Sequence, residues 1–391
     1  MAWLAGAVVT ALAGCLAAGM PVPWWMVLQG GARISDHRRF DNAPIRRADQ
    51  PSALPRAPAV LRWPGGLDTA SAEAELAAQG TAALLVARDG QLVYERYFDG
   101  HGADTLVATF SVAKSVVSLL LGVAIDQGFV AAVDEPLTRW LPELRARDPR
   151  FDRITLRHLL SMRSGIGFDE SYRSPFSDVA RWYLGADLRA AVLQLPVTQP
   201  ADQAFRYSSG DSQLLAMALE RAVGMPLARW AETRLWQPLG AEYDASWSLD
   251  SARTGTARGF CCLNARAVDL VRLGLMVAAG GRWNGQRIVS ADWLALSTAA
   301  QDGLPGAAEP DRRNLEQARG PAAAFYAWHW RRRPLPGVRP LQPGPMVYAQ
   351  GLHGQVLLID AESRTVALRL GRRGGGRHWP AWLDELVRLN R

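Results

Sequence analysis

The chain has 391 residues, of which 49% are hydrophobic and 21% are charged, which suits one large domain or two domains. Its formal net charge is +7. The arginines are scattered and no basic helix or RNA-binding motif occurs, so a nucleic-acid partner is disfavoured. No HExxH motif or Cys/His cluster indicates a catalytic metal, and no phosphate-binding glycine loop is visible, so we expect no cofactor.

Residues 2–32 carry no charged side chain, and about 20 apolar residues suffice to cross a bilayer. We interpret them as a membrane anchor or uncleaved signal. A cleaved secretory signal, a lipoprotein signal at Cys15 and a buried helical hairpin remain alternatives. Arg33, Arg38 and Arg39 follow, and the positive-inside rule would keep them in the cytoplasm, which conflicts with export. We expect a membrane-anchored or exported protein on the periplasmic or extracytoplasmic side, with a cytoplasmic orientation left open.

The rest of the chain predicts a Pro/Arg-rich linker over 33–66 and one domain over 67–391. The expected regular elements are helices at 69–80, 111–128 and 379–390, a strand pair within 82–100 that turns at Asp89-Gly90, and strands at 354–360 and 364–371. Residues 130–300 alternate helices and loops, and 301–346 look like a surface excursion. Strands at both ends of a helical middle predict an α+β fold, a sheet assembled from both termini with an inserted helical lobe.

Cys15, Cys261 and Cys262 are the only cysteines. Adjacent cysteines rarely bond to each other, so we expect no disulfide from the pair, and cysteine usage leaves the redox compartment open.

Lys114 is the only lysine among 44 Lys and Arg residues. Ser111 precedes it by three positions, which on a helix stacks both side chains on one face. Ser111 would also lie at the helix start, where the backbone N–H groups favour a developing anion. A serine hydroxyl needs a base to take its proton, and a buried lysine amine can do this, whereas an arginine guanidinium stays protonated. The spacing alone is a modest signal.

Serine three residues before lysine is the signature of serine β-lactamases and penicillin-binding proteins. Tyr207-Ser208-Ser209 resembles the Tyr-x-Asn element of class C β-lactamases, with serine in place of asparagine. His353-Gly354-Gln355 is the candidate for the third element, Lys/His-Thr-Gly, from which it departs. Four further segments, LLVARDGQLVYERYF, ITLRHLLSMRSGI, GRWNGQRIVSADW and HGQVLLID, also resemble the β-lactamase-related serine hydrolases. The resemblance extends over about residues 66–390. Within that family it is greatest to the branch of 6-aminohexanoate-oligomer hydrolases and esterases.

This resemblance implies an antiparallel sheet flanked by helices, an inserted all-α lobe, and a site in the cleft between them. It implies that Ser111 is the nucleophile, Lys114 the general base and Tyr207 the proton shuttle to the leaving group. The backbone N–H of Ser111 and one near 353–355 would form the oxyanion hole. The expected reaction is hydrolysis of an ester or amide bond, in a small or peptide-like substrate, through an acyl-enzyme. Ser209 in place of asparagine disfavours β-lactams.

By the same resemblance, Asp169 and Tyr172 border the cleft and are candidates for substrate binding. The carboxylates of Asp169, Glu170 and Asp178 could bind an amine on the substrate, and a solvated acidic loop is the alternative. His158 is expected to be structural. Trp328, His329 and Trp330 could line an acyl pocket or form a core strand.

Two other functions remain open. One is a cell-wall D-amino-acid peptidase or carboxypeptidase of the same fold. The other is a catalytically silent, membrane-attached binding protein, which would predict the loss of Ser111, Lys114 or Tyr207, although all three are present.

Overall fold

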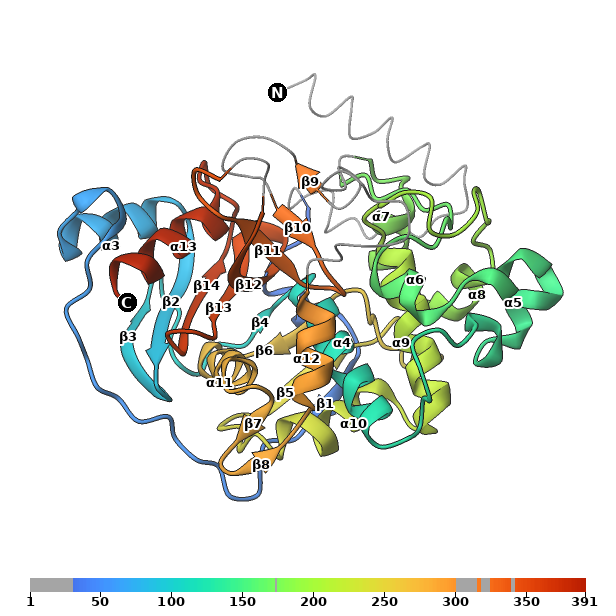
Figure 1. The fold of residues 1–391 in the computed structure, drawn as a ribbon, viewed down its shortest axis with the longest axis horizontal. Coiled ribbons are helices and arrows are strands. Elements are labelled where there is room, and N and C mark those ends of the chain that lie inside the picture. The colour runs from blue at the N-terminus through green and yellow to red at the C-terminus, as the bar shows by residue number, and fades with distance from the viewer. Residues whose placement is uncertain (1–30, 173, 300–314, 318–323, 339–341) are drawn as a thin grey trace.

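The computed structural model describes residues 31–172, 174–299, 315–317, 324–338 and 342–391. Within them an eight-stranded antiparallel sheet has the order β3-β2-β14-β13-β12-β11-β10-β9 (Figure 1). Its strands are β2 (Thr81–Arg88), β3 (Gln91–Tyr97), β9 (Leu315–Gln317), β10 (Ala324–Tyr326), β11 (Arg331–Pro334), β12 (Pro343–Gly351), β13 (Gln355–Asp360) and β14 (Thr365–Gly371). Val86 of β2 lies opposite Ala367 of β14, so the sheet is assembled from both ends of the chain, as predicted.

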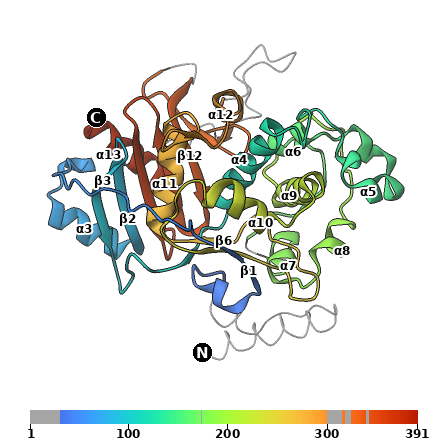
Figure 2. The same cartoon turned by 90° about the horizontal axis from the view of Figure 1, so that it is seen from below.

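Helices cover both faces of this sheet, because successive side chains of a strand point to opposite faces. On β2, Leu84 and Val86 belong to the smaller core, whereas Leu85 and Ala87 belong to the larger one. Figures 1 and 2 show α3 and α13 on one face and α4 and α11 on the other. The bounds are α3 (Thr69–Ala78), α4 (Val112–Asp126), α11 (Ala267–Ala278), α12 (Ala291–Thr298) and α13 (Trp379–Leu389).

A helical lobe lies beside the sheet and is formed by the chain between α4 and α11 (Figure 1). Its helices are α5 (Pro142–Arg147), α6 (Leu156–Leu160), α7 (Asp178–Leu184), α8 (Leu188–Val192), α9 (Ser209–Val223) and α10 (Leu227–Ala231). Helix α9 packs against α4 and α6, which joins the lobe to the sheet side of the molecule. The α+β architecture with an inserted helical lobe is therefore confirmed.

Residues 33–66 differ from the expected linker, because they are part of the folded domain. They contribute β1 (Asn42–Ile45) to a small sheet of order β1-β5-β6-β4, with β5 (Ala245–Ser248), β6 (Leu263–Ala265) and β4 (Val107–Ala108). Ile45 is fully buried. Beyond β1 the backbone stays attached, since Ala48 N–H donates to the Ala241 carbonyl and Ser52 N–H to that of Gly240. Proline and arginine content suggested a linker, but one short edge strand suffices to fix the segment.

The apolar segment 2–32 lies outside the described residues except for its last two positions, so its anchoring role stays a prediction. Among the helices of the described ranges, none is both long and apolar enough to cross a membrane. Much of the expected excursion at 301–346 also lies outside the described residues, and its described parts contribute strands β9, β10 and β11 and the beginning of β12.

Candidate active site

The start of α4 is held by the small sheet and by the end of β12. Both the backbone N–H and the hydroxyl of Thr109 donate to the Leu263 carbonyl, at 2.9 and 2.8 Å. Phe110 has φ +49°, a left-handed conformation that is rare for a bulky residue and occurs most often at functional sites. A Cβ on Gly351 would lie 2.4 Å from the Thr109 carbonyl oxygen, so only glycine allows β12 to end this close to Ser111.

Lys114 contacts Ser111 as the helical spacing predicts. Its side chain is 2% exposed, and Nζ lies 3.0 Å from Ser111 Oγ. The same Nζ lies 3.1 Å from Ser209 Oγ, on the first residue of α9, and 2.6 Å from the Phe260 carbonyl oxygen. The buried amine therefore joins the sheet side of the cleft to the lobe and has three polar partners.

Glu170 determines the direction of these hydrogen bonds, because an ionised carboxylate only accepts. Its Oε2 lies 2.6 Å from Ser209 N and its Oε1 2.7 Å from Ser209 Oγ. The hydroxyl of Ser209 thus donates to Glu170, and its oxygen must accept from Lys114. The Phe260 carbonyl can only accept a second N–H. Ser111 Oγ is the third polar atom within hydrogen-bond distance of the same Nζ, at 3.0 Å.

The sequence alone did not identify this arrangement. Glu170 was considered only as one of three carboxylates that could bind an amine, and the signature of the family carries no signal for it. The Phe260 carbonyl is a backbone group, which no residue pattern marks.

Tyr207 contacts Lys114 through its ring. Nζ lies 5.2 Å from the ring centroid, within the range of cation–π attraction, and the Arg331 guanidinium lies 5.1 Å from the same ring. Among the described residues, no hydrogen bond joins the Tyr207 hydroxyl to Ser111 or to Lys114. Tyr207 is therefore beside the predicted base, but its predicted proton transfer requires movement or a bridging group.

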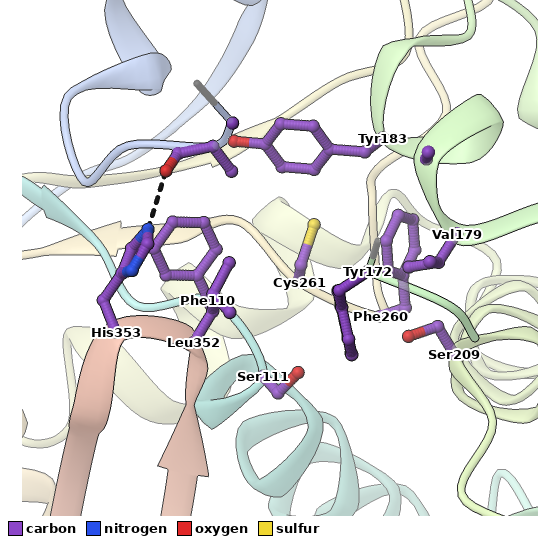
Figure 3. Close-up of a pocket in the computed structure, with 13 residues that line it drawn as sticks. Phe110, Ser111, Tyr172, Val179, Tyr183, Ser209, Phe260, Cys261, Leu352 and His353 are labelled. Atoms are coloured by element: carbon purple, nitrogen blue, oxygen red, sulfur yellow. Dashed lines mark hydrogen bonds between the residues drawn. The ribbon is translucent and has the colours of Figure 1, made fainter. Parts of the chain in front are cut away.

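A cavity of about 250 Å³ opens beside Ser111 (Figure 3). Figure 3 shows Ser111 in the lower part of the view, Ser209 and Val179 together at the right, and Tyr183 of α7 at the top, across from Ser111. The remaining walls come from the chain before α4, the loop before α7 and α7 itself, the loop before β6 and the turn after β12. The described residues that form them are Gly31, Ala32, Phe110, Tyr172, Ala180, Phe260, Cys261, Leu352 and His353. His353 Nε2 is 2.6 Å from the Ala32 carbonyl oxygen. The cavity is thus lined largely by apolar and aromatic side chains.

Other predicted site residues are not brought to this cavity. Gln355 is fully buried, and its amide group bonds the backbone N and O of Gly371. Gly354 has φ +72° and packs against Trp379 and Arg369. Asp169 is exposed, and its carboxylate accepts from Ser171 N at 3.0 Å. Of the predicted substrate-binding residues, Ser209, Tyr172 and His353 line the cavity.

His158 is structural, as expected, and Trp328, His329 and Trp330 are buried but lie between two strands rather than in the expected core strand. His158 accepts from the Thr155 backbone N–H and completes a capping box at the start of α6. Trp328, His329 and Trp330 are buried in the turn between β10 and β11, where Ala327 N–H donates to the Trp330 carbonyl. His329 Nδ1 lies 3.0 Å from the Lys114 carbonyl oxygen, and burial lowers the pKa of this imidazole to about 3. The neutral imidazole of His329 therefore binds the backbone carbonyl of Lys114 in the first turn of α4.

The expectation that Cys261 and Cys262 stay unbonded is wrong, because they form a disulfide with each other. Cys262 adopts φ +68°. The Cys261 carbonyl accepts a hydrogen bond from Trp247 Nε1, and the Cys262 carbonyl accepts one from Ser248 N. This local turn, which sequence spacing does not reveal, permits the bond. The cross-link directly follows Phe260, whose carbonyl binds Lys114.

Comparison with known proteins agrees with this geometry. The family model described as Beta-lactamase matches residues 69–381. A 6-aminohexanoate-dimer hydrolase from Paenarthrobacter ureafaciens is 28% identical over 315 residues, which span 76% of this chain and 75% of the relative. Esterase EstB from Burkholderia gladioli is 32% identical over 179 residues, 41% of this chain and 45% of the esterase.

The fold recurs in a solved structure from Bacillus anthracis that is assigned as a 6-aminohexanoate-dimer hydrolase. Its TM-score is 0.74 at 20% identity, with 92% of this chain and 93% of that chain covered. The match to the family model extends over most of the domain that contains the sheet, the lobe and the cleft. The chain therefore belongs to the beta-lactamase family and is a serine hydrolase of that family.

Proposed function

We propose that the protein cleaves an ester or amide bond of a small or linear substrate through an acyl-enzyme on Ser111. The observation that carries this proposal is the contact of Lys114 Nζ with Ser111 Oγ at 3.0 Å, with both other Nζ partners able to accept. Such a pair can transfer the hydroxyl proton to the amine. The names of the hydrolase and esterase relatives support the same bond classes.

The proposed reaction begins when Ser111 Oγ attacks the carbonyl carbon and its proton passes to Lys114 Nζ. The backbone N–H of Ser111 and one from the turn that begins at Leu352 stabilise the oxyanion. When the tetrahedral intermediate collapses, the leaving group takes the proton from Lys114 through Tyr207. Water then attacks the acyl-enzyme by the reverse transfers, which restores Ser111 and releases the acid.

A fluorophosphonate probe tests the nucleophile. We expect mass spectrometry to find the adduct on Ser111, and the Ser111→Ala variant to lose both the adduct and the hydrolysis of p-nitrophenyl esters. An adduct elsewhere, together with full activity of the variant, would refute the assignment.

We also propose that short-chain esters are cleaved far faster than β-lactams. Ser209 stands where the related class C motif has asparagine, and its hydroxyl is engaged by Lys114 and Glu170. The test compares kcat/KM for p-nitrophenyl butyrate and nitrocefin with the same preparation. Comparable turnover of the two substrates would reverse this ranking.

We further propose that residues 2–32 attach the enzyme to a membrane, in support of which the segment lacks any charged side chain. Cell fractionation of the full chain and of a variant lacking residues 2–30 tests this. The truncation stops before Gly31, because Gly31 and Ala32 line the cavity. Full-length protein found only in the soluble fraction, with residue 1 intact, would reject the anchor.

A further inference from the structure

The cavity beside Ser111 presents no charged side chain of the described residues to a substrate. Its walls are formed by aromatic, aliphatic and hydroxyl side chains, the disulfide-bonded Cys261 and, among the described lining residues, one imidazole, that of His353. The loop and helix around it do contain acidic residues, namely Glu170, Asp178 and, at the N-terminal side, Asp36. Whether the site can accept a substrate that ends in an amine depends on whether one of these carboxylates is available.

Glu170 is the acidic residue nearest to Ser209, and its oxygens are already engaged. Oε2 accepts from Ser209 N, while Oε1 accepts from Ser209 Oγ and, at 2.6 Å, from the Tyr172 hydroxyl. Glu170 is also absent from the described residues that line the cavity, whereas Ser209 and Tyr172, the residues that donate to it, are among them. An ammonium group in the cavity would therefore meet these two side chains before the carboxylate.

The two aspartates are engaged in the same way. Asp36 is 1% exposed, and its Oδ2 accepts from the Tyr183 hydroxyl at 2.9 Å and from Arg33 N at 2.8 Å. Tyr183 lines the cavity (Figure 3), and its hydroxyl donates to Asp36. Asp178 accepts from Asp169 N at 2.9 Å and from Arg181 Nη2 at 2.6 Å, and it is not among the described residues that line the cavity.

We infer that the substrate group entering this cavity is an uncharged, apolar chain, and that the same chain ending in an ammonium group is rejected. This inference rests on the proposed function of Ser111. An ammonium would lose its water without gaining a carboxylate, and the transfer of an unpaired charge into an apolar site is strongly unfavourable. The inference separates this chain from its relative named as a 6-aminohexanoate-dimer hydrolase, whose named substrate has an amino end.

Two matched substrate pairs test this inference. The first is p-nitrophenyl heptanoate against p-nitrophenyl 6-aminohexanoate, in which an ammonium replaces the terminal methyl group of the acyl chain. The second is heptyl acetate against 6-aminohexyl acetate, which makes the same replacement in the alcohol. Measurements at pH 6 keep the amine protonated, since its ordinary pKa is about 10. We expect kcat/KM to favour the methyl-ended substrate by on the order of 100-fold in at least one pair.

Ala180 provides a gain-of-function variant. It lines the cavity, and as the third residue of α7 it stands where the helix N-terminus favours a carboxylate. We expect Ala180→Asp to reduce the preference for the methyl-ended substrate about 10-fold in the discriminating pair. Ala180→Asn, which has the same shape without the charge, is the matched control and should keep the preference of the wild type.

The outcomes distinguish this inference from the proposed function. Equal kcat/KM values within about 3-fold in both pairs, with Ser111→Ala inactive, would overturn the apolar-chain inference and leave the serine mechanism standing. Activity retained by Ser111→Ala would instead overturn the proposed function. If Ala180→Asp fails to fold, the wild-type ratios in the two pairs still decide the question.

Discussion

Helices α4 and α9 are both 15 residues long and pack against each other, and each begins after a serine with a charged residue three positions on. In α9, Ser208 has an extended backbone and its hydroxyl accepts from the backbone N–H of Asp211. In α4, Ser111 already has helical φ and ψ and makes no such cap. Its hydroxyl instead contacts the side chain of Lys114.

The difference arises in the turn before α4. The N–H groups of Val112, Ala113 and Lys114 donate to the carbonyls three residues earlier, so the first turn is satisfied by backbone alone. Helix starts normally need a side chain for these groups. Because the start of α4 needs no side-chain cap, the Ser111 hydroxyl is free of that role and can contact Lys114. The left-handed backbone of Phe110 belongs to the same turn.

Exchange of each serine for alanine tests the comparison most strongly. Ser111→Ala should lower kcat at least about 10⁴-fold with little change in melting temperature, because the nucleophile is not a cap. Ser208→Ala should lower the free energy of unfolding by about 1 kcal/mol, the usual value of a lost N-cap, and keep kcat within a few-fold. Ester kinetics and thermal unfolding of the two variants measure both effects. The reverse pattern would show that the two serines have been assigned the wrong way round.

The next largest effect is expected at Lys114. Lys114→Arg should be nearly as inactive as Lys114→Ala, with single-turnover acylation slower by about 10²–10⁴-fold, because a guanidinium stays protonated and cannot accept the Ser111 proton. Circular dichroism checks that both variants fold. A folded Lys114→Arg enzyme that acylates within a few-fold of wild type would mean that positive charge, not basicity, explains the single lysine.

The sequence predicted these two residues because their chemistry is local, three positions apart on one helix. It also predicted strands β2, β3, β13 and β14 of the main sheet, which have clear apolar runs and, between β2 and β3, a turn at Asp89-Gly90, but it read the region of β9 to β11 as a surface excursion. It missed Glu170, because that contact joins a loop to α9 across 39 positions. It also missed β1, which is four residues long and depends on pairing with β5, and the Cys261–Cys262 bond, which depends on the local turn. These three features depend on contacts between distant residues or on local backbone conformation, and a residue pattern contains no information on either.

Glu170→Gln tests the direction of the hydrogen bonds that join Glu170, Ser209 and Lys114. A glutamine amide can donate to Ser209 Oγ as well as accept, so it no longer compels the serine to accept from Lys114. We expect kcat/KM for a p-nitrophenyl ester to fall about 10-fold, in line with the loss of one charge-assisted hydrogen bond. Asp169→Asn is the matched control, since Asp169 is the exposed neighbour whose carboxylate bonds only within its own loop, and it should remain within 2-fold of wild type. Equal effects of the two variants would contradict the special position of Glu170.

The smallest effect on turnover is expected at Asp211, the counterpart of Lys114 in α9. Its side chain is 1% exposed, Oδ1 accepts from Ser164 Oγ at 2.7 Å, and burial raises its pKa to about 8. In the unfolded chain an aspartate has a pKa of about 4. Between these values the folded state holds a proton that the unfolded state has lost, so the contribution of Asp211 to stability falls as the pH rises from about 4 to about 8.

Asp211→Asn has nearly the same shape and cannot ionise, so it removes this dependence. The free energy of unfolding of the variant, relative to wild type, should therefore increase with pH by up to about 1.4 kcal/mol per pH unit between pH 5 and pH 7. Urea unfolding at several pH values measures it, and ester turnover at pH 7 should stay within a few-fold. Parallel stability curves would mean that Asp211 is ionised in the folded protein. We expect instead that α9 buries a neutral acid at the position that Lys114 occupies in α4.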